Sequence, residues 1–391
     1  MQFELNESHR LMVETARKVG GRFGLDYWRQ RDANEEFAAD FWQAVCDAGL
    51  CGVALPAEYG GSGLGMLEMA LIIDELAAAG GGSTVGQLFM NNPIFGGVAI
   101  SKFGSDAVKR DYLPKLVSGK MRFAMALTEP DAGTNTLALK TFAERDGNDG
   151  WRLNGSKIWI TCVPQAQKIL VVARTLRPDQ VKRRSDGISM FLIDVEREGL
   201  THSSIEKLGT HTNPSSLVYF DSVKVRSDEL IGTLDHGWHE LLHVLNTERI
   251  VTTACLVGTG RLALRLAVDY AATRKVFNDT PIGAYQGLQF PLAQAYAELE
   301  CARLMNYKAA WLHDSGQPYG SEANIGKLIA SQATTAALDR AMQTMGGMGF
   351  SKEMHLERLW RDARLFRFAP VSEEMILNYL SVHDLGMPRG Y

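Results

Sequence analysis

The sequence is poor in several features that would assign it to a specialised class of protein. Its 391 residues contain five cysteines, an odd number, and no two of them form a Cys-x-x-Cys pair. This pattern argues against a disulfide scaffold and against a cysteine-based metal site, and it favours a reduced, cytoplasmic setting. The amino terminus carries acidic residues rather than an apolar core, so we predict no signal peptide.

Strong net charge and long apolar runs are also missing. The net charge is −4 at pH 7, without the basic stripe that nucleic-acid binding needs. No apolar stretch is long enough to cross a bilayer, so we expect no membrane insertion. What remains is a chain that is 46% hydrophobic, enough to bury one large core or two to three linked ones.

The spacing of apolar residues divides the chain into three regions. Residues 1–120 show helical periodicity, residues 121–232 hold short runs rich in β-branched and aromatic residues, and residues 233–391 return to long helical patterns. The predicted fold class is α+β, with an amino-terminal helical domain, a compact antiparallel β domain and a carboxy-terminal four-helix bundle. The bundle helices are expected at 238–273, 285–315, 320–346 and 370–382.

Two polar motifs in the predicted β domain can bind a flat heteroaromatic ring. Residues 126–135, Ala-Leu-Thr-Glu-Pro-Asp-Ala-Gly-Thr-Asn, offer hydroxyls and amides in a loop after a strand. In residues 154–161, Asn154-Gly155 predicts a tight hairpin turn, and Trp159 and Thr161 fall on one face of the next strand. Taken singly, an ordinary turn and a core tryptophan explain these motifs better.

Two motifs in the last region can bind phosphate. Arg274 follows a long helix and can pair with a diphosphate, although a solvated arginine favoured by the helix dipole is the simpler alternative. Residues 343–349, Gln-Thr-Met-Gly-Gly-Met-Gly, offer glycine amides to a phosphate or an adenine, or form a helix C-cap.

Two further motifs suggest other classes of protein. His239-Glu-Leu-Leu-His243 matches the HExxH pattern of zinc hydrolases, with Glu240 as the base, but the extension to a third histidine is absent. A zinc hydrolase that uses His239, Glu240 and His243 is therefore an alternative, and our expectation is that no metal is bound. Gly258-Thr-Gly-Arg-Leu-Ala matches a dinucleotide-binding pattern, but helical periodicity continues through it, which favours small residues on a packed helix face.

The order and spacing of the motifs resemble the acyl-CoA dehydrogenase family over about residues 5–390. The resemblance implies a helical/β/helical subunit, in a homotetramer or dimer, that shares FAD across a subunit interface. It also implies α,β-oxidation of an acyl-CoA thioester, with an electron-transfer flavoprotein as acceptor. The matching segments are Leu55-Pro-Ala-Glu-Tyr-Gly-Gly, Leu127-Thr-Glu-Pro-Asp-Ala-Gly-Thr, Asn154-Gly-Ser-Lys-Ile-Trp-Ile-Thr, Lys207-Leu-Gly, Arg274-Lys-Val-Phe, Gln343-Thr-Met-Gly-Gly-Met-Gly-Phe and Arg361-Asp-Ala-Arg.

The resemblance also implies which residues meet the cofactor and the substrate. Three groups are expected to bind FAD: one at the flavin ring, one at the diphosphate and adenine, and one at the FAD of a neighbouring subunit. Thr134 is expected near the pantetheine and Arg249 near the CoA channel. The three FAD groups are, in that order, Leu127, Thr128, Trp159 and Thr161; Arg274, Phe277 and Gln286; and Gln343, Gly346 and Gly347.

The catalytic base departs from the usual pattern of this family. In most relatives the base is the Glu of a Tyr-Glu-Gly-Thr segment after Arg-Asp-Ala, and this chain has Pro370 at that position. In the family the backbone N–H at this position donates to the thioester oxygen, and proline has no N–H. Relatives that resemble isovaleryl-CoA dehydrogenase place the base on the first helix of the last domain, which implies Glu248, with Glu373 and Glu374 as alternatives. Residues 372–375 look like crotonobetainyl-CoA reductase, so an enoyl-CoA-type reductase is an alternative, as is a scaffold without flavin.

Overall fold

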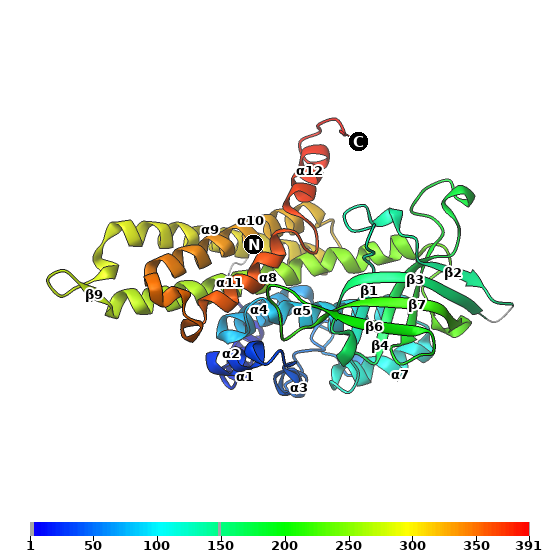
Figure 1. Cartoon of the computed structure of the whole chain (residues 1–391), viewed down its shortest axis with the longest axis horizontal. Coiled ribbons are helices and arrows are strands. Elements are labelled where there is room, and N and C mark those ends of the chain that lie inside the picture. The colour runs from blue at the N-terminus through cyan, green and yellow to red at the C-terminus, as the bar shows by residue number, and fades with distance from the viewer. Residues whose placement is uncertain (1–3, 148–149, 391) are drawn as a thin grey trace.

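The computed structural model describes residues 4–147 and 150–390, arranged in three successive parts (Figure 1). The first part is helical, and the side chain of Asn6 caps its first helix by accepting a hydrogen bond of 2.8 Å from the N–H of His9. Its α-helices are α1 (Glu7–Gly21), α2 (Leu25–Ala33), α3 (Ala39–Asp47), α4 (Met66–Leu76), α5 (Thr84–Phe89), α6 (Ala99–Phe103) and α7 (Asp106–Val117).

The second part is a sheet with the strand order β6-β7-β3-β2-β4-β5-β8, and β1 pairs with β4 beside this path. The sheet is mixed rather than antiparallel, because β1 and β2 run parallel to β4. Both β1 and β4 are buried along their whole length, as parallel strands usually are, and strand periodicity does not reveal strand direction. The strands are β1 (Phe123–Ala126), β2 (Phe142–Arg145), β3 (Gly150–Thr161), β4 (Lys168–Arg174), β5 (Ile188–Asp194), β6 (Leu200–Ile205), β7 (Ser215–Arg226) and β8 (Leu230–Ile231).

Strand β3 runs without interruption through Asn154 and Gly155, so the hairpin turn predicted there is wrong. A bulge against β7 lies between Leu153 and Gly155. Gly155 has a φ of +145°, and a Cβ atom at this position would lie 2.6 Å from the hydroxyl of Thr141. The glycine therefore allows a bulge and a close approach of β2 rather than a turn.

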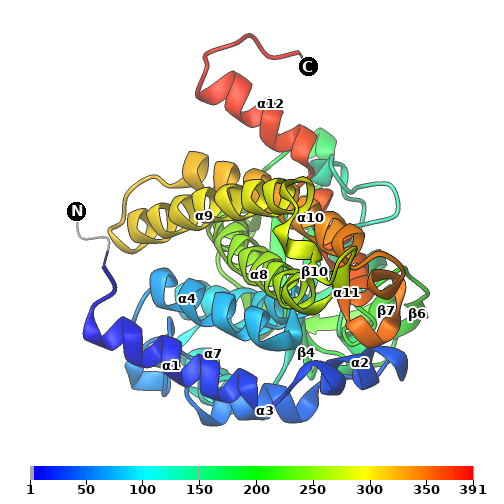
Figure 2. The same cartoon turned by 90° about the vertical axis from the view of Figure 1, so that its left-hand side faces the viewer.

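The third part is helical, and its long helices α8, α9 and α10 lie side by side (Figure 2). The last helix, α12, was expected as the fourth member of this bundle, but it stands away from the others and touches the bundle mainly through α10. Helix α4 packs on α8 and α9 instead, since an amphipathic pattern reveals a buried face but not its partner. The helices are α8 (Gly237–Thr273), α9 (Gln286–Asp314), α10 (Gly320–Met345), α11 (Leu356–Arg364) and α12 (Glu373–His383).

Helix α8 is the core of the molecule. Contrary to the sequence expectation, it is long and apolar enough to cross a membrane by length and composition, but 83% of that apolar window is buried inside the protein. It continues through Gly258 and Gly260, as predicted. A Cβ atom at Gly258 would lie 2.3 Å from the carbonyl oxygen of Asp74, and one at Gly260 would lie 2.7 Å from the side chain of Leu299. These glycines bring α4 and α9 close to α8.

Replacing Gly258 by alanine should therefore destabilise the fold, because the new methyl group collides with the backbone of α4. We expect a loss of about 1–3 kcal/mol in the free energy of unfolding, measured by denaturant titration. Gly21→Ala is the matched control, since Gly21 ends α1 and has open space around it. Equal stability of the two variants would contradict close packing of α8 on α4.

Candidate active site

A buried ion pair joins the two polar motifs of the β domain. Lys157 on β3 is completely buried, and its ammonium donates to Glu129 Oε1 at 2.9 Å and to the carbonyl oxygen of Leu127 at 2.8 Å. Glu129 also accepts hydrogen bonds from the N–H groups of Lys140 and Thr141, at 2.6 and 2.9 Å. The pair therefore fixes the loop after β1 against β3.

Burial and pairing have opposite effects on these two groups. Burial lowers the pKa of Lys157 to about 8, although the charge of Glu129 opposes the change. Burial alone would raise the pKa of Glu129, but the charge of Lys157 and the donors from residues 140 and 141 lower it below its usual value. Both groups are thus charged at neutral pH, although both are buried.

Trp159 and Thr161 project from the end of β3 next to this loop. A second bulge against β7 lies between Lys157 and Ile160, and Trp159 within it has a φ of +62°. Ile160 is buried, whereas the indole of Trp159 is 53% exposed. The main chain of this segment is held by the N–H of residue 158, which donates to the carbonyl oxygen of Thr128 at 2.9 Å. The bulge thereby exposes a large ring on the segment that is hydrogen-bonded to the backbone of Thr128 and that ends at Thr161.

The Arg361-Asp-Ala-Arg segment contacts the loop that follows the Lys207-Leu-Gly segment. The carboxylate of Asp362 accepts hydrogen bonds from the N–H of Thr210 and from the hydroxyl of Thr84, the latter at 3.2 Å. Arg361 donates to the carbonyl oxygen of Leu208 at 3.2 Å and to Asp32 at 2.6 Å. The Arg361-Asp-Ala-Arg segment therefore anchors the loop after Lys207 to α11 and to the amino-terminal helices.

Glu248 is a buried carboxylate without a partner. It lies on α8, is 4% exposed, and forms no hydrogen bond or ion pair within residues 4–147 and 150–390. Burial raises its pKa to about 8, and the nearby charges of Arg249 and Lys327 only partly oppose this. A carboxylate with a pKa near the working pH is suited to accept a proton in catalysis.

The alternative carboxylates differ from Glu248. Glu373 is held by two hydrogen bonds of 2.6 Å from Arg367 and one of 2.9 Å from Ser331. Burial would raise its pKa, but Arg367 and the hydroxyl of Ser331 lower it below the usual value. Glu374 is exposed on the first turn of α12. Neither carboxylate combines burial with a free lone pair as Glu248 does.

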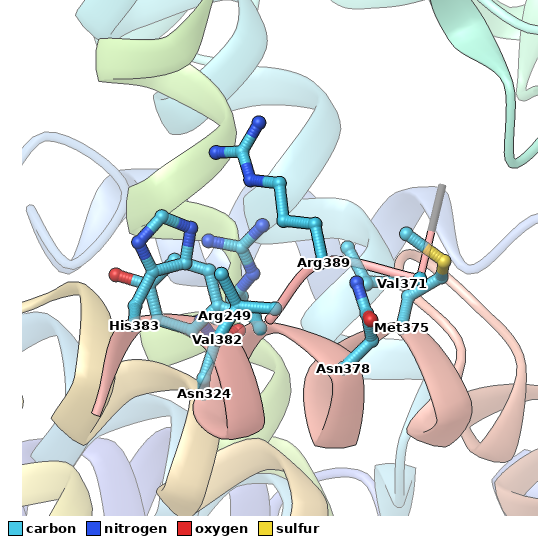
Figure 3. Close-up of a pocket in the computed structure, with 10 residues that line it drawn as sticks. Arg249, Asn324, Val371, Met375, Asn378, Val382, His383 and Arg389 are labelled. Carbon is cyan, nitrogen blue, oxygen red and sulfur yellow. The ribbon is translucent and has the colours of Figure 1, made fainter. Parts of the chain in front are cut away.

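A pocket of about 340 Å³ opens between α8, α10, α12 and the carboxy-terminal tail, and Arg249, the residue after Glu248, lines it. Figure 3 shows the guanidinium groups of Arg249 and Arg389 on the same side of this pocket, with Asn324 and Asn378 below. Nε of Arg249 is buried and has no hydrogen-bond partner among the described residues. Burial lowers the pKa of Arg249. Thr134 lies in an exposed loop of the β domain.

The other residues expected to bind FAD lie at the opposite end of the bundle. Helix α8 runs from the β domain to the hairpin of β9 (Lys275–Val276) and β10 (Thr280–Pro281), as Figure 1 shows. Glu248 and Arg274 are separated by 26 positions along α8, about 39 Å at 1.5 Å per residue. One chain therefore does not bring the two groups together. The distant group is Arg274, Phe277, Gln286, Gln343, Gly346 and Gly347, all exposed.

The chemistry of the two groups fits the two halves of FAD. The exposed indole of Trp159 with the hydroxyls of Thr128 and Thr161 suits a flat heteroaromatic ring. At the far end, Arg274 offers an exposed guanidinium, and Gly346 and neighbouring Gly347 have open space above their backbone, which suits a diphosphate.

Comparison with known proteins identifies the family. Three family models match: the acyl-CoA dehydrogenase N-terminal domain over residues 6–120, its middle domain over residues 124–223, and its C-terminal domain over residues 235–381. The chain belongs to the acyl-CoA dehydrogenase family. It is accordingly an oxidoreductase that uses FAD and acts on acyl-CoA thioesters.

Individual relatives match over nearly the whole chain. Acyl-CoA dehydrogenase FadE12 of Mycobacterium tuberculosis is 40% identical, over 94% of each chain. A structure of glutaryl-coenzyme A dehydrogenase with glutaryl-CoA is 29% identical, has a TM-score of 0.94, and covers 100% of this chain and 98% of its own. An FAD complex of PigA is 27% identical, has a TM-score of 0.92, and matches over 99% of each chain. FadE12 and glutaryl-coenzyme A dehydrogenase are both named as dehydrogenases, and the enoyl-CoA reductase alternative is not favoured.

The zinc alternative is not supported either. The described part of the chain holds no group of three or more His, Cys, Asp or Glu residues placed to bind a metal. Glu240 accepts a hydrogen bond of 3.0 Å from the N–H of Thr233, and Nε2 of His239 lies 3.7 Å from Asp186. The ring of His243 packs near Phe103. The three motif residues therefore have other neighbours, as expected for a chance match.

Removing the ammonium of Lys157 should damage both the fold and the cofactor site of this acyl-CoA dehydrogenase. In Lys157→Met, the carboxylate of Glu129 stays buried without its charge partner. We expect a loss of about 3–5 kcal/mol in the free energy of unfolding and weaker retention of FAD, measured by flavin absorbance after gel filtration. Lys140→Met is the control, because the Lys140 side chain is exposed and pairs with the exposed Asp131. Full FAD retention in Lys157→Met would contradict the role of the pair.

Proposed function

We propose that Glu248 is the general base of an FAD-dependent α,β-dehydrogenation of acyl-CoA thioesters. The observation that carries this proposal is a buried carboxylate, 4% exposed, with no partner among residues 4–147 and 150–390 and a pKa raised to about 8. The α-hydrogen of a thioester is weakly acidic, so its removal needs a base whose pKa is raised and whose oxygen is free to approach it. When bound, FAD supplies the acceptor for the hydride that leaves the β-carbon.

The thioester oxygen needs a hydrogen-bond donor while the α-proton is leaving, because negative charge develops on it. Pro370 has no N–H to offer. The N–H of Val371 has no partner within the described residues, and the carbonyl oxygen of Val371 is fixed by a hydrogen bond of 2.7 Å from Lys327. We assign the N–H of Val371 as this donor, one position later than in the usual family pattern.

The substrate is bound through its CoA portion. Nε of Arg249 is buried and unpartnered at the edge of the 340 Å³ pocket, which suits the polar pantetheine or a phosphate. Thr134 offers an exposed hydroxyl on the β-domain side. These two residues would hold the thioester between Glu248 and the N–H of Val371.

A complete site requires two chains, and we propose a homotetramer or dimer. The group around Trp159 and the group around Arg274 lie at opposite ends of α8, so each chain would contribute half of a site. Helix α9 also exposes a row of apolar side chains that self-association would cover. Each of these is more than half exposed: Phe290, Tyr296, Leu304 and Trp311.

An electron-transfer flavoprotein is the proposed acceptor of the electrons, as in the family that this chain joins. We also propose a cytoplasmic location. All five cysteines are free thiols and four of them are buried, as is usual in a reducing compartment.

Replacing Glu248 by glutamine keeps the size of the side chain and removes its basicity. Under anaerobic conditions Glu248→Gln should retain FAD but lose flavin bleaching by a panel of acyl-CoA thioesters, by at least about 1,000-fold in rate, measured by stopped-flow absorbance. Glu374→Gln should bleach as the parent enzyme does, since Glu374 is exposed. Normal bleaching in Glu248→Gln, or its loss in Glu374→Gln alone, would overturn the assignment.

Mixed oligomers test whether each site draws on two chains. Trp159→Ala and Arg274→Ala should each lose FAD, because each removes one half of every site. Mixed pairs formed by co-expressing the two variants should recover about half of the parental flavin per chain, because one of the two sites in such a pair regains both native halves. Flavin absorbance of doubly tagged oligomers measures this, and no recovery would refute a shared site.

A further inference from the structure

Lys327 is a buried lysine that the family resemblance does not assign to any role. It lies on α10 and is completely buried, although lysine is rarely found in a core without a specific partner. Its ammonium donates a hydrogen bond of 2.7 Å to the carbonyl oxygen of Val371. This bond ties α10 to the short segment between α11 and α12, where Pro370 and Val371 stand in place of the usual family residues.

The charges around Lys327 come from three directions. Charges that interact with Lys327 lie on α8 (Glu248 and Arg249), in the segment before α12 (Arg367) and at the start of α12 (Glu373 and Glu374). Glu373 is already bound by Arg367, and Glu374 is exposed. Glu248, by contrast, forms no ion pair with any described residue, and the positive charges of Arg249 and Lys327 both act on it.

We propose that Lys327 is a positioning residue for the dehydrogenation, which fixes Val371 through its carbonyl oxygen and keeps Glu248 able to ionise. This inference rests on the proposed function of Glu248 and deepens it. One ammonium thus serves two needs of the reaction: its hydrogen bond holds the segment that carries the oxyanion donor, and its positive charge acts on the base. Neither role requires Lys327 to touch the substrate.

The two roles predict different effects of substitution. A positive charge near a buried carboxylate lowers the pKa of that carboxylate, so its removal raises the pKa of Glu248 further. The ionised base then exists only at higher pH, and the rate of flavin reduction should reach half its maximum at a higher pH. Loss of the hydrogen bond to Val371, by contrast, should lower the maximal rate at every pH.

Three variants separate the charge from the hydrogen bond. Lys327→Arg retains both a cation and a donor, Lys327→Gln retains a donor without charge, and Lys327→Met removes both. The measurement is the rate of anaerobic flavin bleaching by an acyl-CoA thioester in the FAD-loaded oligomer between pH 6 and 10. We expect Lys327→Gln and Lys327→Met to shift the pH midpoint upward by about one unit or more. The maximal rate should fall most in Lys327→Met, and Lys327→Arg should restore the midpoint.

A second buried lysine provides the control. Lys168 on β4 pairs with Asp194 at 2.7 Å in the β domain, away from α8. Lys168→Met should reduce stability without moving the pH midpoint. An unchanged pH midpoint in Lys327→Gln would overturn the proposal. Loss of FAD in Lys327→Gln and Lys327→Met, with retention of FAD in Lys327→Arg, would also overturn it, because the charge would then be needed for folding. If Glu248→Gln bleached normally while the midpoint still moved in Lys327→Gln, the assignment of the base would fail instead.

Discussion

The ion pair between Glu129 and Lys157 is the interaction on which the ring-binding half of the site depends. Loops normally lie on the surface because their backbone groups need water, yet the loop after β1 is held against β3 from the inside. The ammonium satisfies one backbone carbonyl, the carboxylate satisfies two N–H groups, and their charges neutralise each other. With the loop fixed, the bulge at Trp159 can turn an indole outward while β3 stays paired with β7 on both sides of it.

Helix α8 plays the corresponding role for the rest of the molecule. Its small residues let α4 and α9 pack closely, which makes it the core of the helical parts. Near its beginning it carries Glu248, and just past its end it places Arg274 on the surface. The same rigid element therefore sets the position of the proposed base and of a proposed phosphate ligand that serves another chain. The geometry of the helix fixes the distance between Glu248 and Arg274 within one chain.

Sequence patterns revealed the three-part plan because helical and strand periodicities reflect burial. They also revealed that Gly258 lies within a helix, since apolar spacing continued through it. They failed where burial is not decisive: strand direction around β4, the bulge at Asn154-Gly155, and the partner of α12. Glu129 and Lys157 were visible within two motifs, but only the fold shows that they meet. Lys327 gave no signal, because a lysine in an Ala-rich helix is normally read as solvated.

The isolation of Glu248 has a thermodynamic consequence for the free enzyme. Its pKa is about 8 in the folded chain, whereas an unfolded glutamate has a pKa near 4.5. Between these two values the native state keeps a proton that the unfolded chain releases, so unfolding at neutral pH liberates that proton. The contribution of this group to stability is complete below the unfolded pKa and declines as the pH rises through the folded one. The contribution of Glu248 to the stability of the free enzyme is therefore more favourable at mildly acidic than at mildly alkaline pH.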